Sequence, residues 1–209
     1  MMFSDLVLAS NNQGKLAEFE RLLAPLSIKV HAQSVFNVPE CDEPFTTFIE
    51  NALRKARHTA RHTGLPALAD DSGVCVPALN GAPGVFSARY ASLFEPLLHP
   101  LLDKDTQNNL QLREHLRGHV DRSAYYYCVL VLVRHADDPQ PIICDGQWWG
   151  QLIEEPRGEG GFGYDPYFLI PEWGVTAAQM DNTQKNALSH RGQAVQILIE
   201  KLNKEYSHK

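Results

Sequence analysis

The chain has 209 residues, of which 44% are hydrophobic and 21% are charged, and its formal net charge is −6. This length and composition are typical of a globular chain with a large core, so we expect a single domain over residues 1–209. The acidic balance disfavours binders of nucleic acid polymers and of anionic membranes, which need a concentrated basic face, and favours a small ligand.

Targeting and redox signals predict a cytoplasmic protein. The N-terminal sequence MMFSDLVLAS has no basic segment, and no window approaches the run of about 18 apolar residues that spans a membrane. The cysteines are widely spaced without a C-x-x-C pair, and three of them lie in strand-like apolar runs: Cys41, Cys75, Cys128 and Cys144. This pattern predicts buried thiols in a reducing compartment and argues against a structural zinc site.

The first third of the chain predicts two strands that alternate with two helices. Apolar periodicity gives a strand, a helix, a strand and a helix in that order, over residues 3–10, 14–26, 28–33 and 46–64. Thr47 and Glu50 have the spacing of a capping box at the start of the second helix, and Gly64 and Pro66 end it.

The segment LPALADDSGVCVPAL, residues 65–79, places two carboxylates inside an apolar run. In a regular strand, Asp70 and Asp71 point to opposite faces, so one of them is the better candidate for a metal ligand. Alternatively, DDSG forms a turn in which Gly73 takes a positive φ. Both interpretations stay open from the residues alone.

The remainder predicts a mixed sheet and a final helix. In chain order we expect a turn, an extended segment, a helix, two neighbouring strands, a glycine-rich loop and an amphipathic helix, over residues 80–84, 85–90, 105–119, 123–135, 141–155, 158–166 and 189–206. The alternation of strands and helices predicts one α/β domain.

Two loops have the composition of ligand sites. The segment SNNQGK, Ser10 to Lys15, joins a predicted strand to a predicted helix. The backbone N–H groups at such a helix start either bind an anion or are capped by the side chains of the loop itself. The segment is not a Walker A loop, because it lacks the first glycine and the final hydroxyl of that motif. GEGGFG, 158–163, matches G-x-G-x-x-G, but Pro166 follows where a dinucleotide site needs a helix. We interpret it as a loop that brings Phe162, Tyr164 or Asp165 close to a ligand.

Several cations extend this set. Lys55 has no capping role, and Lys185, His190 and Arg191 surround a predicted helix start at Ser189, against the preference of the helix dipole. Anion loop, cations, carboxylates and glycine-aromatic loop together are typical of a magnesium–nucleotide site, because Mg²⁺ binds one or two carboxylates plus phosphates. A nucleotide-binding sensor stays open, as does a metal-free glycosidase that uses Asp70 or Asp71 with Glu43.

Six ordered motifs carry a resemblance to a known family. They are SNNQGK, FIENALRKA, ADDSG, GAPGVFSARY, GGFGYDP and KNALSHRGQA. Together they resemble the bacterial branch of the inosine triphosphate pyrophosphatases, which act on noncanonical purine nucleotides. The resemblance implies a homodimer with an elongated two-lobed α/β fold, a central mixed sheet flanked by helices, and an active site between the lobes. It also implies Mg²⁺-dependent hydrolysis of ITP, dITP and XTP to the monophosphate and pyrophosphate.

The resemblance also assigns site residues. Asp71 is implied as the general base and as a metal ligand, assisted at the metal by Glu43. The implied substrate contacts are Ser10, Asn11, Asn12, Gln13, Gly14, Lys15, Lys55, Ser72, Arg89, Phe162, Gly163, Tyr164, Asp165, Lys185, His190 and Arg191. Departures from the family pattern are Ser10 for Thr, Gln184 for Glu and Asn11 for Gly, the last at a position where a glycine adopts backbone angles that Asn tolerates less readily.

Overall fold

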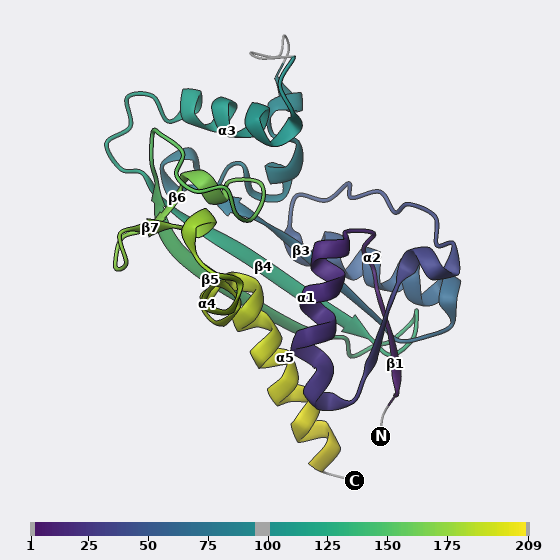
Figure 1. Ribbon diagram of the computed structural model, residues 1–209. Coiled ribbons are helices and arrows are strands. Elements are labelled where there is room, and N and C mark those ends of the chain that lie inside the picture. Colours follow the sequence, from purple (N-terminus) through teal and green to yellow (C-terminus); the bar gives the residue numbers. More distant parts are fainter. Residues whose placement is uncertain (1–2, 95–100, 208–209) are drawn as a thin grey trace. The chain divides into compact units, whose positions relative to one another are not determined.

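The structure is a computed structural model that describes residues 3–94 and 101–207. Its α-helices are α1 (Gln13–Leu23), α2 (Phe48–Thr63), α3 (Lys104–His115), α4 (Asn182–Leu188) and α5 (His190–Ser207) (Figure 1). Its strands are β1 (Asp5–Leu8), β2 (Lys29–Ala32), β3 (Ala67–Cys75), β4 (Ser123–Val133), β5 (Ile142–Leu152), β6 (Phe168–Ile170) and β7 (Val175–Thr176). Short 3-10 helices are η1 (Ala24–Leu26), η2 (Gln33–Phe36), η3 (Pro77–Leu79), η4 (Gly84–Arg89), η5 (Ala91–Leu93), η6 (Asp165–Tyr167) and η7 (Ala177–Gln179).

The strands of the described residues form one mixed sheet in the order β2-β1-β3-β4-β5-β6-β7. Strand β1 is parallel to β2 and to β3, as expected where α1 and α2 provide the crossovers between them. Strand β6 is antiparallel to β5, from which residues 153–167 separate it, and to β7, which follows after the short connection 171–174. The predicted α/β class with a mixed sheet flanked by helices is therefore confirmed.

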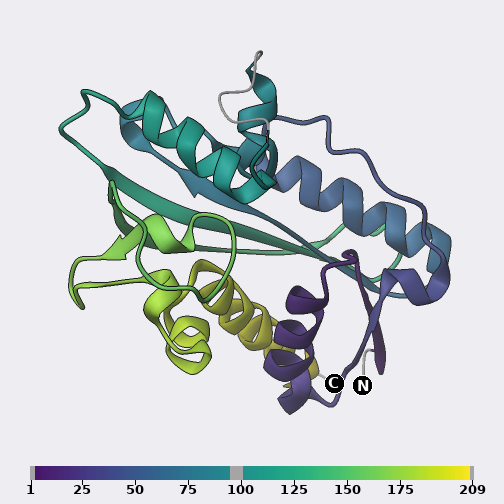
Figure 2. The same cartoon turned by 45° about the horizontal axis from the view of Figure 1, so that its top comes forward.

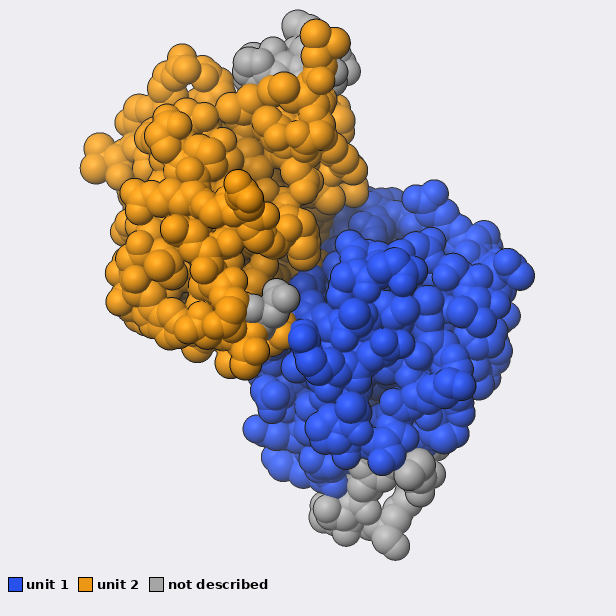
Figure 3. Space-filling model, in the orientation of Figure 1, with its two compact units in different colours: residues 1–71, 128–146, 191–209 blue, residues 72–127, 147–190 orange. Residues whose placement is uncertain are grey.

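The chain divides into two compact units, which are coloured separately in Figure 3. Each unit has its own hydrophobic core. Unit 1 comprises residues 1–71, 128–146 and 191–209, and unit 2 comprises residues 72–127 and 147–190, within the described ranges. The core of unit 1 includes Leu8, Phe19, Leu130 and Leu198, and that of unit 2 includes Leu112, Tyr126, Trp148 and Phe168. The arrangement of two lobes in a single domain stays a prediction.

In unit 1 the sheet lies between two layers of helices. Helices α1 and α5 lie side by side on one face, and α2 lies on the opposite face (Figures 1 and 2). Phe19 and Leu23 of α1 share the core with Ala194, Leu198 and Leu202 of α5. This packing brings the first turn of α1, the middle of β3 and the start of α5 into one region of the unit.

Local sequence signals account for the helix ends of this unit. Asn12 caps α1, and its Oδ1 accepts a hydrogen bond from the Lys15 backbone N–H at 3.1 Å. The Glu50 N–H donates to Thr47 Oγ1 at 3.4 Å and the Thr47 hydroxyl donates to the Glu50 carboxylate at 2.5 Å, so Thr47 and Glu50 pair at the start of α2 as their spacing predicted.

Strand β3 runs without interruption through Asp70, Asp71 and Gly73, so the alternative of a DDSG turn is wrong. Gly73 does not adopt a positive φ. It is needed for a close approach, because a Cβ at this position would lie 2.3 Å from the Gly84 carbonyl oxygen and 2.5 Å from Ser87 Oγ. Gly73 is therefore required because η4 packs closely against β3, and not because the chain turns there.

The expectation of an extended segment over residues 85–90 is also wrong. This stretch forms the 3-10 helix η4, in which the Ser87 hydroxyl donates to the Gly84 carbonyl at 2.7 Å. The same hydroxyl accepts the Val74 N–H of β3 at 2.9 Å. A serine that bonds to nearby backbone in this way offers an alternative to strand pairing.

All four cysteines are free thiols, as predicted. Cys75, Cys128 and Cys144 are buried, whereas the prediction of burial is wrong for Cys41, which is only partly buried. Among the described residues, no helix combines the length and the hydropathy that crossing a membrane requires.

The loop between β4 and β5 offers a test of acid stability. Asp138 is 1% exposed; its carboxylate accepts hydrogen bonds from the Arg134 guanidinium at 2.6 and 2.8 Å and from the backbone N–H groups of Arg134 and Gln140 at 2.9 Å. These bonds, chiefly those from the Arg134 side chain, hold the pKa of Asp138 below its ordinary value. The charged form therefore stabilises the fold above about pH 4, and this contribution is lost as the pH falls further.

We expect Asp138→Asn to lower the free energy of unfolding by about 1–3 kcal/mol at pH 7, because the new amide N–H₂ faces the guanidinium. Urea unfolding at pH 7 and at pH 3 measures the difference in unfolding free energy between the wild-type protein and the variant. This difference should be smaller at pH 3. Asp137→Asn, at an exposed neighbour whose side chain is 89% accessible, is the control and should change little. A gap equally wide at both pH values would contradict this account.

Candidate functional site

The structure distributes the predicted site residues over the two units. Unit 1 holds the loop Ser10–Lys15 with Glu43, Lys55, Asp71 and Arg191, and unit 2 holds Ser72, Arg89, Phe162–Asp165, Lys185 and His190. We call the first group the acidic–basic set and the second the aromatic set. Within unit 1, contacts join Lys15 to Arg191 through Asp70, and Lys55 to Asp71 and Glu43; within unit 2, they join Phe162, Asp165 and Lys185. That the two sets line one cleft stays a prediction.

The loop before α1 has the geometry of an anion site. Residues 11–14 are exposed, and the first turn of α1 contains no acidic residue that would neutralise its partial positive charge. Ser10 Oγ accepts the Asn12 N–H at 3.1 Å, which fixes the entry to the helix. Asn11 is not among the described non-glycine residues with positive φ, which are Ser27, Asn37 and Asn80, so its backbone is unstrained.

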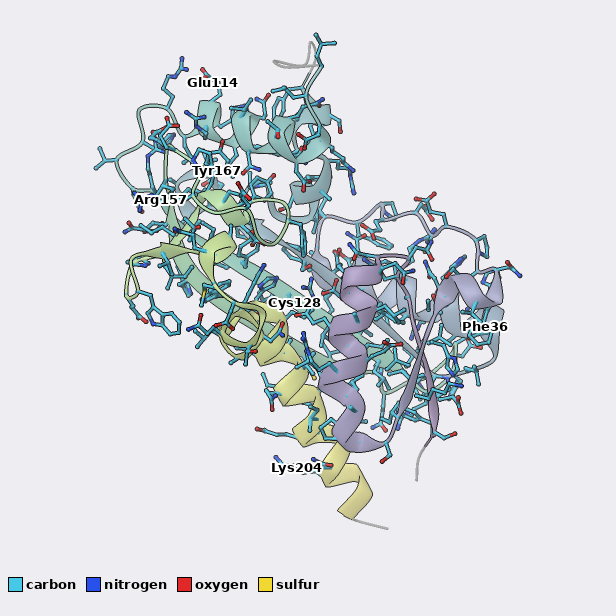
Figure 4. The ribbon with its side chains drawn as sticks, in the orientation of Figure 1. Phe36, Glu114, Cys128, Arg157, Tyr167 and Lys204 are labelled. Atoms are coloured by element: carbon cyan, nitrogen blue, oxygen red, sulfur yellow. The ribbon has the colours of Figure 1, made fainter. Side chains whose placement is uncertain are left out.

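Asp70 is the buried centre of a charged network in unit 1. Its side chain is 1% exposed, and its Oδ1 forms an ion pair with the Lys15 ammonium. Its Oδ2 accepts Arg191 Nε at 2.9 Å and the Cys128 thiol at 3.3 Å. Cys128, on β4, is labelled in Figure 4. Arg191 Nη1 in turn donates to Glu18 at 3.1 Å. The two carboxylates balance the two cations, so this network can remain ionised in a buried position.

Asp71 belongs to a second cluster around Lys55. The Lys55 ammonium lies 3.2 Å from Asp71 Oδ1, 2.7 Å from Glu43 Oε1 and 2.9 Å from the Asp70 carbonyl oxygen. Three acceptors therefore surround its three donors. In this arrangement Lys55 holds two carboxylates together, and the predicted phosphate contact would require it to exchange one of them. The other carboxylate oxygen, Asp71 Oδ2, is buried and has no hydrogen-bond partner among the described residues.

The pKa values of the two adjacent aspartates are shifted in opposite directions. Burial alone would raise the pKa of Asp70, but the charges of Arg191 and Lys15 outweigh it and hold that pKa well below the ordinary value. Burial raises the pKa of Asp71 to about 6, only partly opposed by Lys55 and reinforced by Glu43. Their side chains leave β3 toward different partners, as the alternation of a strand predicts. Of the pair, Asp71 is the carboxylate that can exchange a proton near neutral pH.

The donors around Lys55 fit a hard divalent cation. Among the described residues, no group of three or more His, Cys, Asp and Glu side chains could hold a metal ion by itself. Mg²⁺ does not need such a group, since it takes one or two carboxylates and completes its shell with water and phosphate oxygens. The unpartnered Asp71 Oδ2 and the nearby Glu43 are donors of that kind.

In unit 2 the glycine-rich loop is organised by Asp165. This carboxylate is 3% exposed, and its Oδ2 accepts the Phe162 N–H at 2.8 Å and the Lys185 ammonium at 2.5 Å. Gly161 has a φ of +74°, and a Cβ there would lie 2.0 Å from Asp165 Oδ2, so the loop requires a glycine at this point. The described strand β5 ends ten residues before Phe162, and no helix opens within the glycines, which excludes the dinucleotide fingerprint as expected.

The loop residues differ in exposure. Phe162 is 56% exposed, with the Lys185 ammonium 5.4 Å from the centroid of its ring. Tyr164 is buried, and its hydroxyl donates to the Ser87 carbonyl at 2.9 Å. Gly163 is held by α3, where its N–H donates to Asp105 and its carbonyl accepts from Asn109, both at 2.8 Å. Phe162 therefore offers an accessible ring on a fixed backbone.

The expectation that Lys185, His190 and Arg191 surround one helix start is wrong for Lys185. Lys185 lies in the last turn of a separate helix, α4, which Asp181 caps, and a cation there agrees with the helix dipole. His190 and Arg191 begin α5, and Ser189 directly precedes them. Arg89 ends η4, with its guanidinium 5.3 Å from the Phe86 ring centroid, and Ser72 lies on β3; their substrate contacts stay predictions.

Sequence reasoning missed several residues that organise the two sets. Glu18 and Cys128 complete the network of Asp70, Asn109 holds the glycine loop, and Tyr126 contacts both Asp165 and His190. Tyr126 stands in a run of three tyrosines, and the alternation of β4 buries it together with Ala124 and Cys128. That alternation was the available signal.

The family model, the similar sequences and the similar solved structures all indicate the same protein family. A model of the Ham1 family matches residues 6–201. A dITP/XTP pyrophosphatase from Chromobacterium violaceum is 60% identical over 96% of this chain and 98% of its own length, and one from Ralstonia nicotianae is 59% identical over 94% and 96%. Among solved structures, a HAM1 protein from Coxiella burnetii matches with a TM-score of 0.88 and 48% identity, over 97% of this chain and 100% of its own.

Removing the Asp70 carboxylate should destabilise the fold strongly. Asp70→Ala leaves Arg191 buried without its main counter-charge, so we expect the free energy of unfolding to fall by about 3–5 kcal/mol in urea. Asp42→Ala is the control, because it breaks an exposed ion pair with Arg54 that contributes little. Equal losses from both variants would contradict the central role of Asp70.

Proposed function

The chain belongs to the Ham1 family, and on this premise we propose that it hydrolyses noncanonical purine nucleoside triphosphates, namely ITP, dITP and XTP, to the monophosphate and pyrophosphate. Membership confirms the resemblance predicted from the six motifs. The match covers nearly the whole of the chain and of the dITP/XTP pyrophosphatases that it resembles, which supports transfer of the activity.

One observation carries the proposal at the level of chemistry. Asp71 is a buried carboxylate with a pKa raised to about 6, an unpartnered Oδ2, and a lysine and a glutamate beside it. A carboxylate of raised pKa accepts a proton from water more readily than an ordinary aspartate. We assign Asp71 as the general base that takes the proton of the water attacking the α-phosphorus.

The acidic–basic set provides the surroundings for the triphosphate. The exposed first turn of α1 offers backbone N–H groups to phosphate oxygens, and Lys15, whose side chain is 20% exposed, adds a positive charge beside them. Asp71 and Glu43 are the residues that would hold Mg²⁺. When bound, the ion neutralises phosphate charge and lowers the pKa of bound water. Lys55 keeps both carboxylates in place.

The aromatic set provides the surroundings for the base. Phe162 presents an accessible ring for stacking against a purine, and Lys185 and His190 are candidate donors to an oxygen at the purine 6-position. Adenine carries an amino group there, which donates instead of accepting, so a site built on such donors disfavours it. The described bonds of Arg191 go to Asp70 and Glu18, so we place Arg191 with the phosphate-side network.

From the resemblance we expect a homodimer. From the N-terminal sequence and the cysteine spacing we expect a cytoplasmic location, and from the acidic balance we expect no nucleic acid polymer or membrane as partner. The net charge of −6 agrees with a small-molecule substrate.

A nucleotide panel tests the activity directly. We expect pyrophosphate release from ITP, dITP and XTP in Mg²⁺, little release from ATP, and none after EDTA is added, because without the ion the Asp71 and Glu43 carboxylates repel the negative triphosphate. A coupled pyrophosphate assay measures each rate. Binding of ITP without release would indicate a sensor, and EDTA-resistant sugar hydrolysis would indicate a glycosidase; either result would overturn the proposal.

The role of Asp71 is tested by an isosteric change. Asp71→Asn keeps the shape of the side chain but cannot take a proton, so we expect kcat for ITP to fall at least about 100-fold while KM changes less than about threefold. Steady-state kinetics give both values. Asp42→Asn, an exposed carboxylate beside Glu43, is the matched control and should retain full activity. Equal losses in kcat and in affinity would count against a base at this position.

A further inference from the structure

Tyr126 is a buried aromatic residue of β4 that sequence motifs do not mark. It is 8% exposed and packs in the core of unit 2, where its ring lies 4.6 Å from that of Phe168. Its hydroxyl donates a hydrogen bond to Asp165 Oδ1 at 3.0 Å. A buried hydroxyl needs such a partner, whereas packing alone would be met by phenylalanine.

The partner of this hydroxyl is the carboxylate on which the glycine loop depends. Tyr126 occupies Oδ1 of Asp165, and the Phe162 N–H and the Lys185 ammonium share Oδ2. A carboxylate held at both oxygens cannot rotate without breaking a bond on each side. The Tyr126 hydroxyl therefore fixes the plane in which Oδ2 meets Phe162 and Lys185.

The ring of Tyr126 also contacts His190, another member of the aromatic set. It stacks on the imidazole of His190, with centroids 4.8 Å apart and an angle of 9° between the planes. Such stacking limits the tilt of the imidazole, although it leaves the edge of the ring able to form hydrogen bonds. Tyr126 thus contacts His190 directly, and Phe162 and Lys185 through a single carboxylate.

We propose that Tyr126 is a positioning residue that sets base selectivity, through the Asp165 carboxylate and the His190 ring. The inference rests on the proposed function for its substrate class. The Lys185 ammonium has three N–H donors, and one of them bonds to Asp165. The position of this ammonium relative to the Phe162 ring therefore decides where a base oxygen can accept a hydrogen bond from it. Tyr126 controls that direction without touching the base.

The test compares two tyrosine hydroxyls of the same core. Tyr126→Phe removes the bond to Asp165 and keeps the ring, its packing and its stacking on His190. Tyr90→Phe is the matched control: Tyr90 is 5% exposed, belongs to the same core, and its hydroxyl pairs with His115 Nδ1 at 2.6 Å instead of with a carboxylate. Both variants lose one buried hydrogen bond, so a general loss of stability affects them alike.

For Tyr126→Phe we expect the ratio of kcat/KM for ITP to kcat/KM for ATP to fall about 3- to 10-fold, the range that one net hydrogen bond supplies. We expect the loss to appear in KM for ITP, with kcat within about twofold, because proton transfer belongs to Asp71. The amide resonance of Phe162 should also shift in this variant. Tyr90→Phe should leave the ratio and that resonance unchanged.

An unchanged ITP/ATP ratio in Tyr126→Phe, or equal changes in both variants, would overturn the inference. Calorimetric binding of IMP and AMP separates this outcome from failure of the proposed activity. If the wild-type chain hydrolyses no triphosphate but Tyr126→Phe alone weakens IMP relative to AMP, the activity is wrong and the positioning role stands. If neither variant alters the IMP/AMP ratio, the positioning role is wrong whatever the activity.

Discussion

The ion pair network of Asp70 is the constraint on which the rest of unit 1 depends. One buried carboxylate joins three segments far apart in sequence: Lys15 in the first turn of α1, Asp70 on β3 and Arg191 at the start of α5. A buried carboxylate is tolerated when charges and hydrogen bonds replace its water, and here each oxygen has a cationic partner. The N-terminus of α1 is therefore fixed against the sheet by charge, while Phe19 and Leu198 fix the bodies of the helices by packing.

Because Lys15 and Arg191 both pair with Asp70, the neighbouring Asp71 is left with a different set of partners and a different pKa. Because strand residues alternate, Asp71 cannot share the cations of Asp70 and meets Lys55 instead, in competition with Glu43. One ammonium against two carboxylates leaves a negative excess, and burial then raises the pKa of Asp71. Two identical side chains thus acquire opposite roles: Asp70 braces the fold, and Asp71 keeps an oxygen that no described group satisfies. In the proposed function, that oxygen takes a metal ion or a reacting water.

Much of this could be predicted from the sequence, and the failures have physical reasons. Helices α1 and α2, the mixed sheet and the opposite orientation of Asp70 and Asp71 follow from periodicity and caps, which are local. The η4 turn was missed because its cause is a contact between Ser87 and β3. Lys185 was placed on the wrong helix because the boundary between α4 and α5 at Ser189 has no glycine or proline to announce it. The partners of Arg191 lie 121 and 173 residues away, beyond any pattern.

Unit 2 also contains a buried carboxylate that pairs with a lysine, but the other partners of this carboxylate differ from those in unit 1. Asp165, like Asp70, is a buried carboxylate opposed by a lysine, but its other partners are a tyrosine hydroxyl and a backbone N–H rather than an arginine. A single lysine against Asp165 neutralises the charge and leaves Lys185 donors available, whereas the two cations of Asp70 are balanced only with the help of Glu18. Because the other two partners of Asp165 are neutral donors, this carboxylate can hold the loop in place while its one lysine keeps donors for a ligand. This difference in partners explains why the same residue type braces the fold in one unit and orients candidate base contacts in the other.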